Sequence, residues 1–238
     1  MKPISRNFSE MGKIERRALS ERVASILRRA IIEGKLMPGE HLPEIWLSKK
    51  LGVSRAPIRE AFRILGIEGL VEINLQKGAR VREITAKDVE NIYELRSTLD
   101  SLAVRLAMSN LQENHLVQLE KFLHQMKGYV KKGDIHSYRR LNTEFHNFFY
   151  QRSCNDWLYN VNNSLMNHIM RLRSLSLSMS ERLHQSYKEH IQIVDAVKKG
   201  NIEEAEEVAK RHTKEAGKFV LRLFLERERA SMGMEASV

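Results

Sequence analysis

The segment 43–65 constrains the fold of this chain more than any other part of the sequence. A helical pattern that begins near Glu44 is ended by Gly52, and a second helical pattern begins two residues later. Ser54 is a residue type whose hydroxyl caps helix N-termini, and Pro57 falls in a first turn, where a missing N–H costs little. The segment therefore predicts two short helices joined by a tight turn.

The second of these helices has two different faces. Its apolar residues recur at intervals of three and four, and its arginines recur every four residues on another side. The two sets are Ile58, Ala61, Phe62 and Leu65, and Arg55, Arg59 and Arg63. A short helix with an apolar back and an arginine front is typical of a recognition helix in the DNA major groove. We expect Arg55 and Arg59 to contact base edges and Arg63 to contact phosphate.

The neighbouring segments complete a winged helix-turn-helix. Residues 19–33 carry apolar side chains at helical spacing, and Gly34 follows as a stop. These apolar residues are Val23, Ile26, Leu27, Ala30 and Ile31. Residues 70–74 and 79–83 alternate as strands do, with a turn between them. Lys77 at the tip of this hairpin can reach phosphate or the minor groove, although a merely solvated lysine would give the same pattern.

Positive charge is concentrated in the same third of the chain. Residues 1–83 carry 17 Lys and Arg against 10 Asp and Glu, a net +7, whereas the remaining residues carry 23 against 20, a net +3. A basic excess can be only a solvated surface. Its coincidence with the helix pair instead favours double-stranded DNA as a partner, because basic side chains neutralise phosphates.

Composition and hydropathy exclude several other classes of protein. No apolar run approaches the roughly 18 residues of a membrane span, and the first residues lack the apolar core of a signal peptide. The one cysteine, Cys154, cannot form a disulfide within a single chain, which fits a reducing compartment. We therefore expect a cytoplasmic protein with no membrane partner.

From Asp88 onward the sequence pattern is helical throughout. Six helices are predicted, at 88–109, 113–132, 134–152, 155–177, 180–199 and 202–228. The predicted fold class is therefore mainly α, with an N-terminal winged helix-turn-helix and a C-terminal antiparallel all-α helical bundle. The predicted organisation is a flexible arm (1–15), a DNA-binding domain (16–83), a linker (84–87), a helical domain (88–230) and a tail (231–238).

Three of the nine histidines occupy related positions in the helical part. His146 lies four residues after Asn142, so the two share a helix face. At 1.5 Å per residue, His190 and His212 lie roughly 15 and 18 Å on either side of Gly200, and thus at nearly the same level of a helical hairpin. Three imidazoles and an amide oxygen can therefore converge, although separate core histidines would show the same spacing.

Arg96 is a second unusual residue of the helical part. It lies at the edge of an apolar stripe, and a buried arginine needs an anion. The stripe consists of Ile92, Leu95, Leu99, Leu102, Ala103 and Leu106. The anion can be Asp100, four residues on, in an ordinary helix pair. It can also be the carboxylate of a bound ligand, gripped by the guanidinium fork, which is the interpretation we favour.

The first domain resembles the DNA-binding domain of the GntR family of bacterial transcription regulators. The resemblance is carried by Pro38-Gly39, Leu51-Gly-Val-Ser-Arg-Ala-Pro-Ile-Arg-Glu-Ala61, Glu68-Gly-Leu-Val71 and Lys77-Gly78. Ser48 departs from the alanine that is usual in the family, and serine is small enough to fit. The predicted DNA-binding residues are Ser54, Arg55, Arg59, Arg63, Lys77 and Gly78.

The helical domain resembles the FCD ligand-binding domain of FadR-type regulators, in the shorter, VanR-like form with six helices. Many FCD domains bind a divalent metal through a carboxylate, a histidine four residues later, and two histidines on the last two helices. His146, His190 and His212 match those histidines, and Asn142 stands where aspartate is usual, which implies weaker metal affinity. Imidazole-rich sites suit zinc or nickel, and the identity of the ion stays open.

These features favour a DNA-binding transcription regulator, in this family more often a repressor than an activator, over an enzyme. We expect a homodimer on a near-palindromic operator, whose affinity is modulated by a small organic acid bound near the metal and Arg96. Two alternatives are an effector-independent architectural protein and a metal-dependent hydrolase with a DNA-tethering domain. The hydrolase lacks a general base if Glu144 and Glu189 point away from the ligand faces, as we expect.

Overall fold

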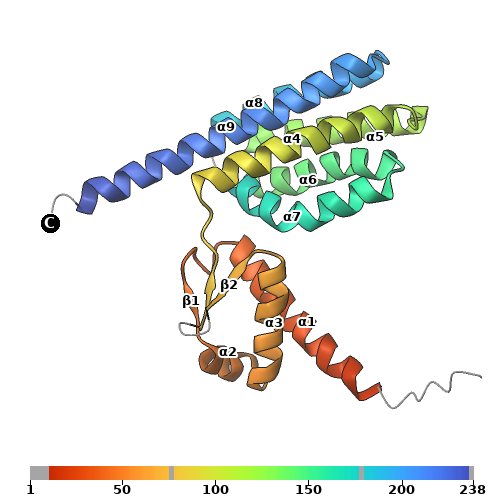
Figure 1. Cartoon of the computed structure of the whole chain (residues 1–238). Coiled ribbons are helices and arrows are strands. Elements are labelled where there is room, and N and C mark those ends of the chain that lie inside the picture. The colour runs from red at the N-terminus through yellow and green to blue at the C-terminus, as the bar shows by residue number, and fades with distance from the viewer. Residues whose placement is uncertain (1–10, 75–77, 177–179, 236–238) are drawn as a thin grey trace, which may run out of the picture. The chain divides into compact units, whose positions relative to one another are not determined.

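A computed structural model describes residues 11–74, 78–176 and 180–235 (Figure 1). The chain divides into two compact units, Met1–Glu83 and Ile84–Val238, each with its own hydrophobic core. Over the described residues the structure is mainly helical, as predicted, and its one small sheet belongs to the first unit. No helix in these ranges is both long and apolar enough to cross a membrane.

The first unit is a winged helix-turn-helix. Its elements are α1 (Met11–Ile32), β1 (His41–Leu42), α2 (Glu44–Leu51), α3 (Arg55–Ile67), β2 (Val71–Asn74) and β3 (Gly78–Val81). The strands pair antiparallel in the order β1-β3-β2, with Val71 opposite Val81. The strand β1 was missed by the sequence pattern, because two residues are too few to show alternation. Lys77 lies outside the described residues.

The helix pair forms as its residues predict. All four apolar residues of the predicted α3 face are buried in the core of this unit. Gly52 ends α2 with a φ of +66°, a conformation that glycine adopts without strain. The hydroxyl of Ser48, at the position where the family usually has alanine, donates a hydrogen bond to the Val53 carbonyl at 2.6 Å, which ties the end of α2 to the turn.

Two details of the first unit correct the predictions. Ile26 is 53% exposed, and Ala24 instead faces the core together with Val23 and Leu27. Ser54 occupies the N-cap position of α3 with extended backbone, but its side chain makes no capping hydrogen bond. Its exposed hydroxyl is therefore not used to cap the helix.

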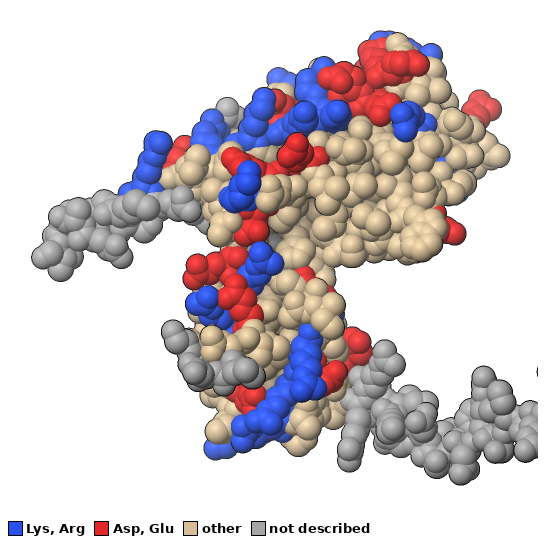
Figure 2. All heavy atoms as spheres, in the orientation of Figure 1, with Lys and Arg blue, Asp and Glu red and all other residues tan. Residues whose placement is uncertain are grey.

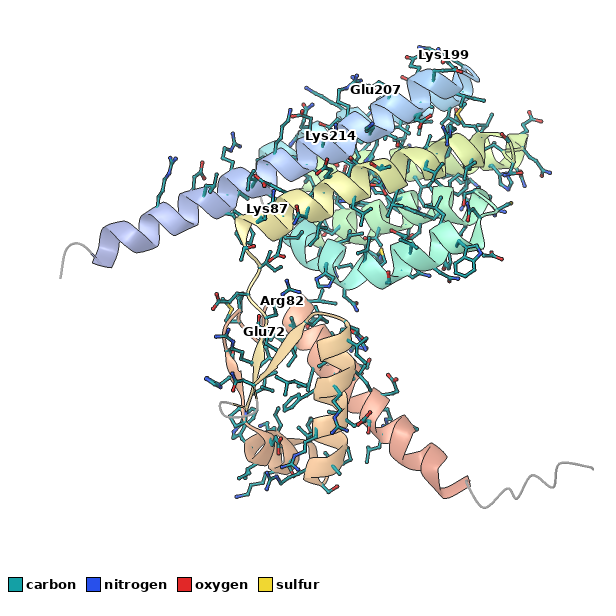
Figure 3. All side chains as sticks on the ribbon, in the orientation of Figure 1. Glu72, Arg82, Lys87, Lys199, Glu207 and Lys214 are labelled. Atoms are coloured by element: carbon teal, nitrogen blue, oxygen red, sulfur yellow. The ribbon has the colours of Figure 1, made fainter. Side chains whose placement is uncertain are left out.

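The second unit is an antiparallel bundle whose described residues form the six predicted helices in the predicted order. They are α4 (Ala86–Met108), α5 (Glu113–Lys132), α6 (Ile135–Arg152), α7 (Asp156–Ser176), α8 (Ser180–Lys198) and α9 (Ile202–Glu235). Charged side chains such as Glu207 and Lys214 on α9, and Lys199 in the turn before it, project away from the bundle (Figure 3). The opposite side of α9 packs against α4 and α8.

Helix ends differ from the predicted boundaries in three places. Helix α1 begins at Met11, so the predicted arm 1–15 is too long. Helix α4 begins at Ala86, where Thr85 and Asp88 form a reciprocal capping box, so the linker 84–87 is shorter than predicted. Helix α9 continues to Glu235, beyond the predicted domain end at 230. The prediction of a tail at 231–238 is therefore wrong for residues 231–235, which are helical.

Helix α4 buries the predicted apolar stripe only in part: Ala103 is fully buried and Leu99, Leu102 and Leu106 are half-buried against the core, but another face is buried more deeply. Leu95 is 45% exposed, whereas Arg96, Ser97 and Asp100 are buried. Close packing against α9 explains the difference, because a Cβ added at Gly217 would lie 2.7 Å from the Tyr93 Cβ. Such a close approach suits small side chains and leaves the bulkier leucines at the edge of the contact.

Candidate metal centre and DNA-binding surface

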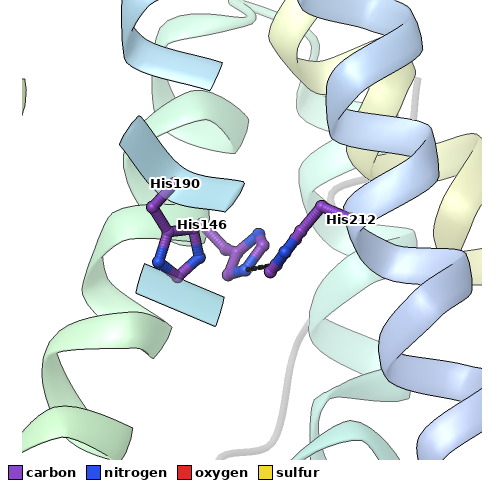
Figure 4. A group of neighbouring side chains, drawn as sticks. All are labelled: His146, His190 and His212. Atoms are coloured by element: carbon purple, nitrogen blue, oxygen red, sulfur yellow. Dashed lines mark hydrogen bonds between the residues drawn. The ribbon is translucent and has the colours of Figure 1, made fainter. Parts of the chain in front are cut away.

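Three buried histidines from three helices meet inside the helical unit (Figure 4). His146 comes from α6, His190 from α8 and His212 from α9, and the turn at Gly200 brings the last two helices together. The ring centroids of His190 and His212 lie 4.6 Å apart, and each is within 5.5 Å of the His146 ring. One ring nitrogen from each residue lies within 4.8 Å of the others, so the structure brings together the histidines that the spacing singles out.

Two of the imidazoles are backed by carboxylates. The Nε2 atoms of His146 and His212 face each other at 3.3 Å. On the outer edge of each ring, the Nδ1 of His212 lies 2.6 Å from Glu189 and the Nδ1 of His146 lies 3.7 Å from Asp100. The hydrogen bond to Glu189 holds His212 in the tautomer with its proton on Nδ1, which leaves Nε2 as a lone-pair donor. Asp100 lies beyond hydrogen-bond distance of His146 and favours the same tautomer by its charge alone.

His190 has a neutral hydrogen-bond partner in place of a carboxylate. Its Nδ1 lies 3.3 Å from the hydroxyl oxygen of Tyr138, and this hydroxyl donates its one proton to Ser186. Burial raises the pKa of Tyr138, so the hydroxyl keeps that proton. The Nδ1 of His190 must then be the donor to Tyr138, and its Nε2 is the nitrogen left with a lone pair.

Glu189 corrects the sequence interpretation, which had it pointing away from the site. It is buried, accepts hydrogen bonds from both terminal nitrogens of Arg182 at 2.8 and 3.0 Å, and contacts His212 on α9. Burial alone would raise the pKa of Glu189, but the hydrogen bonds from His212 and Arg182 outweigh it and lower the pKa to about 2. In His212, burial lowers the pKa more than Glu189 raises it. An ionised carboxylate beside a neutral imidazole is the state that metal binding requires.

Arg96 and Asp100 form the ordinary helix pair that was one of the two predicted arrangements. The Nε of Arg96 lies 3.2 Å from Asp100, and both side chains are buried. Asp100 also accepts hydrogen bonds from the hydroxyls of Tyr150 and Thr213, at 2.9 and 2.7 Å. The clamped ligand that we favoured therefore has to compete with Asp100 for Arg96.

Asn142 is the residue that tests whether the site fits a metal. It is only 3% exposed, and its side-chain oxygen has no hydrogen-bond partner among the described residues. An unsatisfied buried acceptor costs about 1–3 kcal/mol, which a cation would offset. Two nitrogens bound to a tetrahedral ion at 2.0–2.1 Å lie about 3.4 Å apart, close to the 3.3 Å between His146 and His212. The donor set therefore fits a divalent metal.

A small cavity adjoins His146. Its volume, measured as the space open to the centre of a water molecule, is about 10 Å³, which is enough for about one water. Its lining includes Asp100, His146 and Tyr150, together with apolar side chains from α4, α6, α8 and α9. A small organic acid needs a far larger pocket. Entry of such an acid into this cavity would therefore have to displace side chains between these helices.

The predicted DNA-binding surface is the arginine row on α3. Arg55, Arg59 and Arg63 have side chains that are 54%, 57% and 72% exposed, on the side of α3 away from the core. In Figure 2 the Lys and Arg side chains of this unit gather over α2 and α3. The exposed Ser54 precedes the row, and Gly78 begins β3 with a φ of +78°.

One residue of this surface was missed by the sequence interpretation. Glu44, the first residue of α2, lies 3.0 Å from Arg55 and 2.9 Å from Arg59. The sequence contains no signal for this, because the contacts join residues 11 and 15 positions apart on two different helices. Both predicted base-reading arginines are thus held by one carboxylate.

Family models match both units of the chain. Residues 19–81 match the model described as "Bacterial regulatory proteins, gntR family", and residues 91–215 match the model described as "FCD domain". The second match alone spans more than half of the chain.

Relatives and solved structures agree with these matches. A Bacillus subtilis HTH-type transcriptional regulator, YdhC, is 36% identical over 187 residues, which cover 78% of this chain and 82% of the relative. A probable D-xylose utilization operon transcriptional repressor of Paenarthrobacter nicotinovorans is 30% identical over 200 residues, covering 84% and 88%. The structure of Escherichia coli McbR/YncC superposes with a TM-score of 0.71 at 22% identity, covering 87% of this chain and 98% of McbR, which supports the fold.

Proposed function

Because the chain belongs to the GntR family of bacterial transcription regulators and carries an FCD domain, we propose that it is a repressor controlled by a small organic acid. The acid binds beside a divalent metal in the helical unit and changes the affinity of the first unit for operator DNA. The observation that carries this proposal is the convergence of His146, His190 and His212 on one buried point.

The metal is held by the Nε2 atoms of the three histidines, with the oxygen of Asn142 as a weak fourth ligand. Zinc and nickel suit this imidazole-rich donor set. When bound, the ion supplies a positive centre that attracts a carboxylate. Asp100 and Glu189 are each paired with an arginine, so neither leaves an uncompensated negative charge to oppose the anion.

In this proposal Arg96 gives up its ion pair with Asp100 and binds the far end of the acid instead. This exchange moves a residue of α4, and α4 follows the DNA-binding unit directly in the chain. A ligand shifts such an equilibrium only if it binds the two arrangements unequally. The small volume of the cavity supports unequal binding, because the ligand must open the contact among α4, α6, α8 and α9.

An enzymatic role is disfavoured. The similar proteins are transcription regulators. Glu189, the carboxylate nearest the ligands that could serve as a general base, is ionised and already bound to Arg182 and His212. It orients a ligand and is not placed to accept a proton from a water.

The protein acts as a homodimer. The winged unit presents one recognition helix, and two-fold operators match two-fold proteins. The helical unit leaves large apolar side chains exposed on α4 and α7, including Leu95, Trp157 and Val161. Figure 2 shows a broad uncharged face over this part of the helical unit, whereas charges line α9. We place the dimer contact on this face.

The DNA contacts can be tested with two duplexes. The selected duplex is recovered from a random-sequence library by the wild-type protein, and the scrambled duplex has the same composition in another order. Arg59→Ala should weaken binding to the selected duplex by about 1–3 kcal/mol and leave the scrambled duplex less affected. Arg63→Ala should weaken both and reduce the salt dependence of binding. Equal losses on both duplexes in Arg59→Ala would remove the base-reading role.

A further inference from the structure

Glu44 joins the two arginines that lie deepest in the proposed DNA-binding surface. One of its carboxylate oxygens accepts hydrogen bonds from the Nε and Nη2 of Arg55, at 3.2 and 3.0 Å. Both of its oxygens lie within 3.0 Å of the Nε of Arg59. Burial alone would raise the pKa of Glu44, but the hydrogen bonds from Arg55 and Arg59 together outweigh it and lower the pKa. The carboxylate is therefore ionised and shared between two guanidinium groups.

This arrangement has two opposite effects on DNA binding. Two exposed arginines four residues apart repel each other and sample many rotamers, and fixing long side chains costs conformational entropy. A carboxylate between them reduces the repulsion and fixes both before DNA arrives, which lowers the cost of binding in one geometry. The same carboxylate is a negative charge near phosphates, which weakens binding to any sequence.

We propose that Glu44 is a positioning residue for sequence selectivity. It holds Arg55 and Arg59 in the arrangement that fits one base sequence, and it lowers the affinity for all other sequences. This inference rests on the proposed function, because it requires that the two arginines read bases.

The chain offers a matched control for the charge of Glu44. Glu60 is an exposed carboxylate on α3 that pairs with Arg63, the predicted phosphate contact, at 3.1 Å. Glu60→Ala and Glu44→Ala each remove one negative charge from the same surface. They differ in that only Glu44 holds the predicted base-reading arginines.

The test compares affinities for the selected and scrambled duplexes. Glu60→Ala should raise the affinity for both duplexes by the same factor. Glu44→Ala should raise the affinity for the scrambled duplex by a similar factor but should not raise the affinity for the selected duplex. The ratio of the selected-duplex affinity to the scrambled-duplex affinity should therefore fall about tenfold. Glu44→Gln, which keeps a hydrogen-bond acceptor without the charge, should fall between wild type and Glu44→Ala. Equal tightening of both duplexes in Glu44→Ala would show a purely repulsive charge and overturn the inference.

A triple variant separates positioning from other roles. In Glu44→Ala/Arg55→Ala/Arg59→Ala the loss of selectivity should be no larger than in Arg55→Ala/Arg59→Ala, because Glu44 acts through these two arginines. A further loss would mean that Glu44 contacts a base itself, and it would overturn the inference. Thermal unfolding of each variant checks that α2 is intact. If Glu44→Ala does not fold, the Glu44→Gln variant provides the test in its place. Equal losses on both duplexes in Arg59→Ala would instead contradict the proposed function.

Discussion

Asn142 is where this chain departs most clearly from the metal-binding pattern that it resembles. Asn142→Asp adds a negative charge to the ligand set, so it should raise the affinity for zinc or nickel, measured by competition with a chromophoric chelator. Asn142→Leu should lower that affinity. It should also stabilise the metal-free protein, because it removes a buried oxygen that has no hydrogen-bond partner. Unchanged metal affinity in both variants would exclude Asn142 as a ligand.

Glu189 should matter to the metal although it is not itself a ligand. Glu189→Gln weakens the contact that orients His212, and loss of such a partner commonly lowers metal affinity about 10–100-fold. The matched control is Glu207→Gln, which makes the same change at an exposed position of α9. The same competition assay should give wild-type affinity for the control. A wild-type value for Glu189→Gln would mean that the carboxylate plays no part.

The sequence predicts the convergence of the three histidines better than it predicts their surroundings. His146, His190 and His212 can be found from helical spacing and the position of the Gly200 turn. Glu189 could not be found in this way, because it adjoins His190 in sequence and so lies on a different side of α8. In the bundle both sides are covered: His190 contacts Tyr138 on α6, and Glu189 contacts His212 on α9.

At the scale of secondary-structure elements, the contact between α4 and α9 holds one wall of the site. Gly217→Ala should destabilise the helical unit by about 1–3 kcal/mol, because its new Cβ would overlap the inner atoms of Tyr93. Gly128→Ala is the control, since Gly128 lies inside α5 and nothing is within 4 Å of its Cβ position. That change should stabilise by about 0.5–1 kcal/mol. Urea unfolding followed by circular dichroism measures both, and equal stability of Gly217→Ala and wild type would contradict the close packing.

Strong periodicity made most elements predictable, and weak or divided periodicity made the rest difficult. The helices of the bundle and both helices of the helix-turn-helix follow from apolar spacing and glycine stops. The buried face of α4 does not, because this helix has two candidate faces. Its leucines form the more apolar one, yet close packing against Gly217 selects the face with Ser97 and Asp100.

At the scale of the whole molecule, the exposed apolar side chains of α4 and α7 form the surface expected to join two copies. Trp157→Glu should raise the monomer fraction in sedimentation experiments, because a charge would have to be buried at the contact. As the monomer fraction rises, the affinity for the selected duplex should fall. Ile202→Glu, which adds the same charge at an exposed position in the first turn of α9, should remain dimeric. A wild type that sediments as a monomer with and without DNA would refute the dimer.

The central claim is that the histidine cluster controls DNA binding through a bound acid. The decisive measurement compares how strongly zinc-loaded wild type and zinc-treated His190→Ala bind the selected duplex. Each protein is measured with and without one small organic acid. That acid is the one that most raises the melting temperature of the zinc-loaded wild type. The account predicts similar affinities without acid, a shift on adding acid in wild type, and no shift in His190→Ala. It is contradicted if no acid raises the melting temperature, or if both proteins respond equally.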